Sequence, residues 1–177
     1  MKLNANLQDV KSFISLCEEN NIEFCLDGGW GVDALIGHQT RPHEDIDVAV
    51  NRDHAAKLKD ILLTDGYHEN IRHDSGPLNY VLQDDEGHQI EVCTYFKDAK
   101  GYHVFSETEV FDNLISEGFI DGKKVKCISA ECQLKFHTGY EIDEQDYLDM
   151  KLISEKFNLT LPAEYDRFKN KEQGSRP

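Results

Sequence analysis

The sequence predicts an α/β (α+β) fold in which helices flank a mixed β-sheet and a helical region follows at the C-terminus. Strand-like and helix-like patterns alternate over the first two-thirds of the chain, whereas from Ser129 onward apolar residues recur at helical spacing. A turn pattern at residues 84–87 joins two strands as an antiparallel hairpin, which favours a mixed sheet over a purely parallel one. The length of 177 residues suits one domain, or a small domain with a helical appendage.

The chain begins with a predicted amphipathic helix that ends near Asn20. Its apolar residues at helical spacing are Leu7, Val10, Phe13, Ile14 and Cys17. The residues that follow predict, in order, a strand over 23–27, a glycine-rich turn over 28–31, a short helix over 32–36 closed by Gly37, a polar loop over 38–44 and a strand over 45–50.

The remaining elements follow from caps, turns and alternation. Asn51 or Asp53 caps a helix that runs through Leu62 and stops at Gly66. The predicted strands are at residues 67–72, 78–83 and 88–96, followed by a small hairpin over 119–128 that turns at Asp121-Gly122. The final helices are predicted over 134–139 and after Asp143, which has Asp146 three residues later.

The composition, 39% hydrophobic and 30% charged, is that of a soluble globular protein. A formal net charge of −15 disfavours a nucleic-acid partner, because acidic side chains repel phosphates, although the acidity could equally serve solubility alone. We find no signal peptide or membrane span and expect no membrane partner. Five cysteines without C-x-x-C spacing predict reduced thiols and a cytoplasmic protein.

Asp45 and Asp47 are the strongest candidates for metal ligands. Residues i and i+2 of a strand point to the same side, with Cα atoms about 6.6 Å apart, so both carboxylates leave one face. Such a pair can hold Mg²⁺, which prefers oxygen ligands and often bridges to substrate phosphates. By itself, however, the Asp-x-Asp pattern in so acidic a chain is more often a solvated strand edge.

Neighbouring residues favour the metal site. Gly28 and Gly29 follow a strand and precede a helix, where free backbone N–H groups receive phosphates, although a plain tight turn is the alternative. Glu91 is a lone carboxylate in a β-prone strand, where unpaired burial would be costly. Arg41 and His43 precede the aspartates and either meet phosphate oxygens or stay solvated.

Two blocks of sequence resemble a known enzyme family. Residues 26–47, LDGGWGVDALIGHQTRPHEDID, resemble the signature of the small antibiotic nucleotidyltransferases of the lincosamide and aminoglycoside 2''-nucleotidyltransferase type, in the nucleotidyltransferase (polymerase β-like) superfamily. Residues 127–149, CISAECQLKFHTGYEIDEQDYLD, are similar to the helical region of the lincosamide enzymes. The resemblance implies a nucleotidyltransferase domain over 1–128 and a C-terminal helical region over 129–168, and we expect a disordered tail over 169–177.

The resemblance also implies the reaction and the roles of the site residues. A nucleoside monophosphate, AMP by preference, would pass from an NTP (ATP or GTP) to a hydroxyl of a small antibiotic, with Mg²⁺ as cofactor and pyrophosphate as the second product. Gly28, Gly29 and Trp30 would hold the triphosphate. Asp45 and Asp47 would bind the metal, with Glu91 as the third carboxylate and the base. Family members often have Asp at the position of Glu91, and this departure leaves the acceptor open.

A lincosamide is the favoured acceptor, and an aminoglycoside or another small hydroxylated molecule is the first alternative. A toxin-type nucleotidyltransferase that acts on a protein is the second. The acidic residues near the second block suit a cationic drug, although some of them could cap a helix or be solvated: Glu141, Asp143, Glu144, Asp146 and Asp149.

The helical last third also has more apolar residues than one helix pair need bury. These residues are Phe136, Tyr140, Leu148, Leu152, Ile153 and Phe157. The excess predicts a homodimer in which the helices of one subunit help to close the acceptor site of the other, although an ordinary internal core is the alternative.

Overall fold

The computed structural model describes residues 4–73, 75–76, 78–106 and 108–168, so the predicted tail over 169–177 lies outside the described residues. The expected mixed α/β fold is confirmed. The helices are α1 (Leu7–Glu19), α2 (Gly28–Ile36), α3 (Arg52–Thr64), α4 (Ala130–Phe136), α5 (Glu144–Phe157) and the 3-10 turn η1 (Ala163–Tyr165). The strands are β1 (Phe24–Leu26), β2 (Asp45–Asn51), β3 (His68–Glu69), β4 (Asn79–Gln83), β5 (Gln89–Lys97), β6 (His103–Val104), β7 (Val110–Phe111), β8 (Ile115–Ile120) and β9 (Lys123–Ile128).

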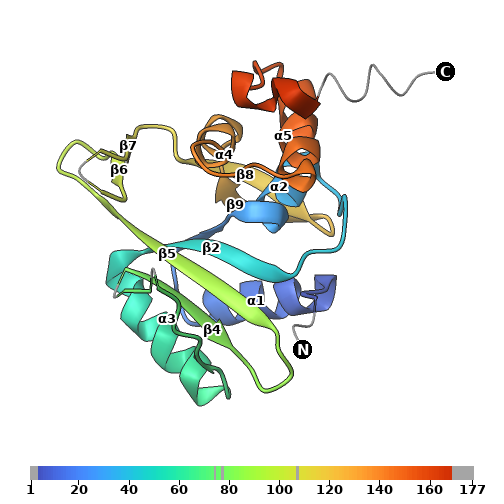
Figure 1. The fold of residues 1–177 in the computed structure, drawn as a ribbon. Helices are drawn as coiled ribbons and strands as arrows, with labels where there is room; N and C mark the ends of the chain where they lie inside the picture. Colours follow the sequence, from blue (N-terminus) through green and yellow to red (C-terminus); the bar gives the residue numbers. More distant parts are fainter. Residues whose placement is uncertain (1–3, 74, 77, 107, 169–177) are drawn as a thin grey trace.

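The main sheet has the strand order β3-β4-β5-β2-β1-β9-β8, and β6 and β7 continue from β5 (Figure 1). β2 runs antiparallel to β1 and parallel to β5, which makes the sheet mixed. The register between β2 and β5 places Asp47 opposite Glu91 and Ala49 opposite Cys93. Two distant parts of the chain therefore bring the predicted carboxylates onto adjacent strands.

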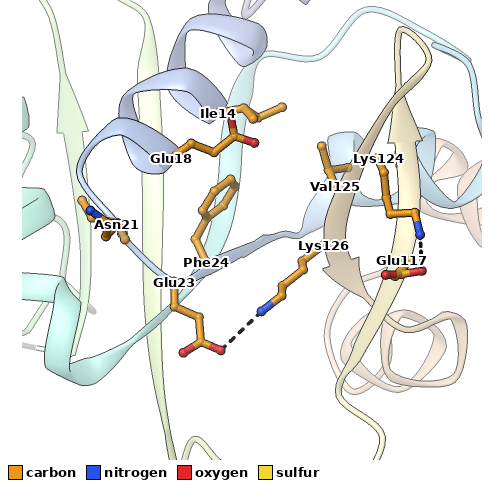
Figure 2. A pocket seen from close by; sticks show the side chains of 10 residues that line it. Ile14, Glu18, Asn21, Glu23, Phe24, Glu117, Lys124, Val125 and Lys126 are labelled. Atoms are coloured by element: carbon orange, nitrogen blue, oxygen red, sulfur yellow. Dashed lines mark hydrogen bonds and ion pairs between the residues drawn. The ribbon is translucent and has the colours of Figure 1, made fainter.

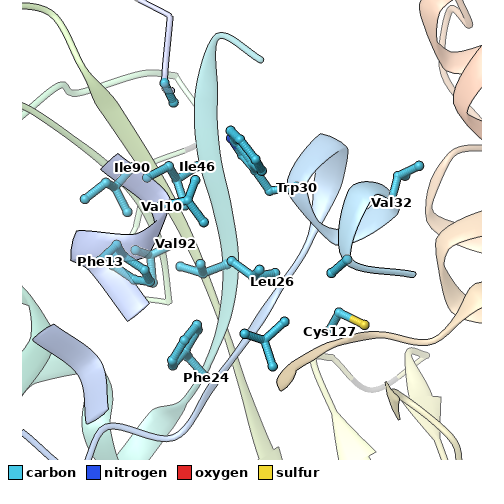
Figure 3. Close-up of a cluster of buried hydrophobic side chains, with 14 of the residues drawn as sticks. Val10, Phe13, Phe24, Leu26, Trp30, Val32, Ile46, Ile90, Val92 and Cys127 are labelled. Atoms are coloured by element: carbon cyan, nitrogen blue, oxygen red, sulfur yellow. The ribbon is translucent and has the colours of Figure 1, made fainter. Parts of the chain in front are cut away.

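One part of the principal hydrophobic core lies between the sheet and α1 and α3. Figure 3 shows Val10 and Phe13 of α1 close to Ile46 of β2 and to Ile90 and Val92 of β5. These sheet residues alternate with the predicted carboxylates, as the period of a strand requires. Burial of the apolar face therefore fixes the direction in which the carboxylates point.

The core also joins the C-terminal helical region to α2. Met150 and Ile153 of α5 belong to the same cluster as Trp30 and Val32 of α2. The domain boundary that we predict after residue 128 falls between β9 and α4, and the two sides of it share this core. None of the helices in the described ranges combines the length and apolarity needed to cross a membrane.

Several elements differ from their predicted extents. The strand predicted over 67–72 is reduced to β3, because its ladder with β4 pairs His68 and Glu69 and is followed by one further hydrogen bond, from the Asn70 N–H to the Val81 carbonyl oxygen at 2.9 Å. The predicted glycine-rich turn is the first turn of α2 itself, since Asp27 caps the helix at Gly28. The helix predicted over 134–139 begins earlier, at Ala130, because the Ser129 side chain accepts a hydrogen bond from the Cys132 backbone N–H.

Candidate active site

The start of α2 lies close to β2. Asp27 caps the helix by accepting the Gly28 N–H at 2.8 Å, and Gly28 adopts a positive φ of 51°. A Cβ atom on Gly28 would lie 2.1 Å from Oδ2 of Asp47, so only glycine fits there without a shift. The first-turn N–H groups of Gly29 and Trp30 have no acceptor within the helix. These features together suit a phosphate group beside Asp47.

The three predicted carboxylates lie on one face of the sheet. Asp45 and Asp47 are two residues apart on β2, and Glu91 is the register partner of Asp47 on β5; all three are partly exposed. Asp47 and Glu91 border a cleft of about 330 Å³, which we call the catalytic cleft, whereas Asp45 lies outside its lining. The cleft is lined by Asp27, Gly28, Asp47, Val48, Asn79, Glu91, Cys93, Phe136 and His137.

This donor set fits a hard divalent cation, because carboxylate oxygens are the ligands that Mg²⁺ prefers. Because Gly28 has no side chain, the start of the helix packs against the Asp47 carboxylate without displacing it. Within the described ranges, no group of three or more His, Cys, Asp or Glu side chains is already gathered around a metal position. The ligand roles of Asp45, Asp47 and Glu91 remain predictions.

Glu91 is held by an arginine that the sequence analysis did not identify. Nη1 of Arg72 donates to Oε2 of Glu91 at 2.7 Å, and Nη2 donates to Oε1 of Gln89 at 3.2 Å. Arg72 lies beyond β3, in a segment that we expected to be strand, and no local pattern connects it with β5. The ion pair of Arg72 with Glu91 depends on β4, which pairs with both β3 and β5 and so brings the two segments together.

His43 is buried, and its ring lies against the start of α2. Its Nε2 is bonded to Oδ2 of Asp33, and its ring centroid is 4.7 Å from that of Trp30. In the described structure its Nδ1 is buried without a hydrogen-bond partner. A Cβ on Gly29 would lie only 2.2 Å from this Nδ1. Of the two states that we considered for His43, solvation is therefore wrong, and the contact with a phosphate remains a prediction.

Asp33 is the second residue that the sequence analysis missed. It is fully buried on α2 and accepts hydrogen bonds from the backbone N–H of Thr40 at 2.9 Å and from its hydroxyl at 2.6 Å. Asp33 therefore fixes both the loop before β2 and the orientation of His43. A polar residue in a short helix gives no sequence signal of this role, because the partners come from the following loop.

Arg41 is bound to the C-terminal helical region. Its Nη2 donates to Oδ2 of Asp149 at 2.7 Å and its Nε donates to Oδ1 at 3.2 Å, while Nη1 donates to the carbonyl oxygen of Pro42 at 3.0 Å. Asp149 is buried on α5. The predicted phosphate contact would thus have to compete with this two-point ion pair. The Trp30 side chain is buried in the core, so only its backbone faces the site.

Asp27 and Cys93 also line the catalytic cleft, and burial raises the pKa of both side chains. Burial raises the pKa of Asp27, and the hydrogen bond from Gly28 opposes that rise. Burial, reinforced by the nearby carboxylates of Asp27, Asp47 and Glu91, raises the pKa of the Cys93 thiol well above its usual value. Cys93 is therefore a neutral lining group at physiological pH and not a nucleophile.

A larger cavity, of about 670 Å³, lies between α1, the start of β1 and the hairpin of β8 and β9 (Figure 2). Its charged rim is neutralised by ion pairs, including Lys126 with Glu23 at 3.5 Å and Lys124 with Glu117 at 2.9 Å. Phe24 and Val125 on its wall belong to the principal core, on the face opposite to the carboxylates. Its lining includes none of the three predicted carboxylates and none of the glycines at the start of α2, so it does not fit the predicted chemistry.

Comparison with known proteins supports the chemical interpretation. A model of the aminoglycoside-2''-adenylyltransferase family matches residues 9–153. The chain is 33% identical over 155 residues to a lincosamide resistance protein of Staphylococcus haemolyticus, and this alignment covers 84% of this chain and 95% of the relative. It is 27% identical over 122 residues to a 2''-aminoglycoside nucleotidyltransferase of Escherichia coli, covering 69% of this chain and 67% of the relative.

Two solved structures have a fold similar to that of this chain. The crystal structure of the lincosamide antibiotic adenylyltransferase LnuA with bound lincomycin superposes with a TM-score of 0.76 at 30% identity, covering 86% of this chain and 98% of LnuA. The structure of ANT(2")-Ia with adenylyl-2"-tobramycin has a TM-score of 0.70 at 18% identity, over 85% of this chain and 88% of the other, and shares the fold. Because the family model spans most of its length, this chain belongs to the aminoglycoside-2''-adenylyltransferase family of nucleotidyltransferase enzymes.

Proposed function

We propose that this enzyme is a Mg²⁺-dependent O-adenylyltransferase that moves AMP from ATP to a hydroxyl of a lincosamide. The observation that carries the proposal is the pairing of Asp47 with Glu91 beside the glycine turn at Gly28. The relative from Staphylococcus haemolyticus and the lincomycin-bound LnuA structure support the acceptor class. The five free cysteines support a reducing, cytoplasmic location.

The placement of the residues supports the following course of the proposed reaction. The acceptor hydroxyl oxygen attacks the α-phosphorus of ATP, the bond from that phosphorus to the bridging oxygen breaks, and pyrophosphate leaves in line. Glu91 accepts the hydroxyl proton while Arg72 fixes the orientation of its carboxylate. The amides of Gly29 and Trp30 donate to a phosphate. Asp45 and Asp47 would hold Mg²⁺, which when bound neutralises charge on the phosphates.

An aminoglycoside is the second candidate acceptor. The matching family model and the Escherichia coli relative favour it. The same carboxylates and the same glycine turn serve either acceptor, so the two candidates differ only in what binds next to Glu91.

Product analysis decides between the two acceptors. Purified enzyme is incubated with Mg²⁺ and ATP, or with GTP, against a panel of lincosamides and aminoglycosides, with pyrophosphate release and product mass as the readouts. We expect a mono-adenylylated lincosamide and no product after chelation of divalent metal. Products from aminoglycosides alone would favour the second candidate. If no pyrophosphate is released with either class of drug, the proposal of antibiotic adenylylation is refuted.

We also propose that the enzyme works as a homodimer. Leu148 and Leu152 lie one turn apart on α5 and are 49% and 36% exposed, whereas Ile153 of the same helix is buried. An interface of about 1,600 Å² over this surface would cover them. Light scattering tests the proposal: a fully active species at the 20.3 kDa of one chain would refute it.

A further inference from the structure

The catalytic face of β5 changes from acidic to apolar along the strand. Glu91, Cys93 and Tyr95 point to the same side, because they are spaced by two residues. Glu91 borders the catalytic cleft, whereas Tyr95 is fully buried in a second hydrophobic cluster with Phe111. The partly buried rings of Phe105 and Phe136 pack against this cluster, so a molecule that presents a hydroxyl to Glu91 and extends along β5 meets these rings.

A second cavity lies beside the catalytic cleft in this direction. It has a volume of about 370 Å³ and is lined by Asp27, Cys93, Phe105, Glu109, Lys135, Phe136 and Thr138. Asp27, Cys93 and Phe136 also line the catalytic cleft, so the two hollows are neighbours with three residues in common. We call the second cavity the acceptor trough.

The wall of the acceptor trough is aromatic. The rings of Phe105 and Phe136 pack edge to face, with centroids 5.7 Å apart, and both residues are partly exposed. Phe111 also packs edge to face with Phe136, with ring centroids 5.2 Å apart, and so fixes the orientation of the Phe136 ring. A fixed, partly exposed pair of rings offers a binding surface to an apolar group or to the apolar face of a sugar ring.

The charges of the acceptor trough suit a single cation. Asp27 lies where the catalytic cleft and the trough meet, and Glu109 lies farther out, whereas Lys135 is a cation of the lining. One ammonium group beside Asp27 would be compensated. A polycation would leave the aromatic wall unused and would place further ammonium groups near Lys135, which costs free energy through like-charge repulsion.

The acidic residues around the start of α5 are less suited to this task, because the lining of the acceptor trough includes none of them. Asp143 and Asp146 form the capping box of the helix, each bonded to the other's backbone N–H. Asp149 is occupied by Arg41. Of the acidic residues that we considered for the drug, Glu141 and Glu144 are exposed at the surface.

We propose that the acceptor trough binds the acceptor of the adenylyl transfer, and that it selects a hydroxylated molecule with one amine and an apolar group. The apolar group packs on Phe105 and Phe136, and the amine lies beside Asp27. This inference rests on the proposed function, because it locates the acceptor of that reaction. It makes Phe105 and Asp27 specificity-determining residues.

Steady-state kinetics with a lincosamide and ATP test the aromatic wall. Phe105→Leu keeps an apolar side chain but removes the ring, so we expect the acceptor KM to rise about tenfold with the ATP KM unchanged. Phe119→Leu on β8 is the matched control, because Phe119 is exposed and lies outside both cavities. If thermal melting shows that Phe105→Leu does not fold, Phe136→Leu replaces it.

The charge is tested separately. Asp27→Asn retains a good helix cap and removes the anion. We expect it to raise the acceptor KM for the free amine while leaving the KM of an N-acetylated acceptor unchanged. Glu144→Gln is the matched control at the start of α5. An effect of Glu144→Gln with none from Phe105→Leu or Asp27→Asn would overturn the proposal and place the acceptor on the helical region.

Calorimetric titration of the lincosamide into the enzyme without nucleotide separates this inference from the proposed function. Binding that Phe105→Leu weakens, with no pyrophosphate release by the wild-type enzyme, would refute the reaction and retain the trough. Turnover of the lincosamide with unchanged kinetics in Phe105→Leu and Phe136→Leu would refute the trough and retain the reaction. If wild-type enzyme neither binds nor turns over the lincosamide, both are wrong.

Discussion

The two faces of the central strands differ in what they contribute. On one face, Ile46 of β2 and Ile90 of β5 are 3% and 2% exposed and belong to the principal core. On the other face, Asp47 and Glu91 are partly exposed and border the catalytic cleft. Because adjacent residues of a strand point to opposite faces, stability and chemistry alternate residue by residue. Neighbouring substitutions should therefore separate the two properties.

The largest effect is expected at Asp47. Asp47→Asn should abolish adenylyl transfer while leaving the free energy of unfolding nearly unchanged, because the amide is a poor ligand for Mg²⁺ but occupies the same volume. Ile46→Ala should instead cost about 2–5 kcal/mol of stability, with kcat per folded molecule retained. Urea unfolding and kcat, measured on both variants, test the contrast. Turnover near wild type in Asp47→Asn at saturating Mg²⁺ would contradict the metal assignment.

Glu91 should follow with a smaller loss. Glu91→Gln should lower kcat by about 10²–10⁴-fold and change the ATP dissociation constant much less, because the amide keeps the shape but cannot accept the proton. Ile90→Val, on the opposite face, should cost about 0.5–1.5 kcal/mol of stability and leave kcat unchanged. If Glu91→Gln instead weakens ATP binding at an unchanged rate per bound complex, Glu91 is a metal ligand only.

The third prediction concerns the glycine next to His43. A Cβ in Gly29→Ala would lie 2.2 Å from Nδ1 of His43, so the imidazole or the helix start must move. We expect a higher ATP KM and a stability loss of about 1–3 kcal/mol from overpacking. Gly76→Ala, where an added Cβ meets nothing within 4 Å, is the control. An unchanged ATP KM in Gly29→Ala would separate His43 from nucleotide binding.

The smallest effect is expected at Arg72. Its ion pair with Glu91 joins side chains that are 35% and 34% exposed, so solvent weakens it to about 0.2–1 kcal/mol. Arg72→Gln should therefore lower kcat less than tenfold and leave the melting temperature nearly unchanged. A loss as large as that in Glu91→Gln would mean that Arg72 contacts the substrate.

Local sequence patterns predicted which side chains of α1 are buried and which side chains of β2 share one face. The helical spacing of Val10 and Phe13 identified α1, and both side chains are buried. The position of Asp45 and Asp47 on one strand face also follows from the period of two. The register that sets Asp47 opposite Glu91 was not predictable, because the pairing of two parallel strands depends on the whole sheet.

The partners of the site residues required tertiary structure. Asp33 resembles a solvated polar residue of a short helix, yet it is buried because the loop from Thr40 to His43 folds back over it. The ion pair of Arg41 with Asp149 joins residues separated by 108 positions in the chain. Long-range partners of this kind leave no periodic trace, so spacing and composition do not reveal them.

The parallel pairing of β2 with β5 also determines when the active site forms during folding. α3, β3 and β4 intervene between the two strands, so their pairing must close a long loop, whereas β4 and β5 meet as a local hairpin. A slip of one residue would place Ile90 beside Asp47 and turn Glu91 toward the core. A chain that has collapsed without this register therefore has helices and strands but no catalytic centre. During refolding, the recovery of activity should lag behind the recovery of the circular dichroism signal.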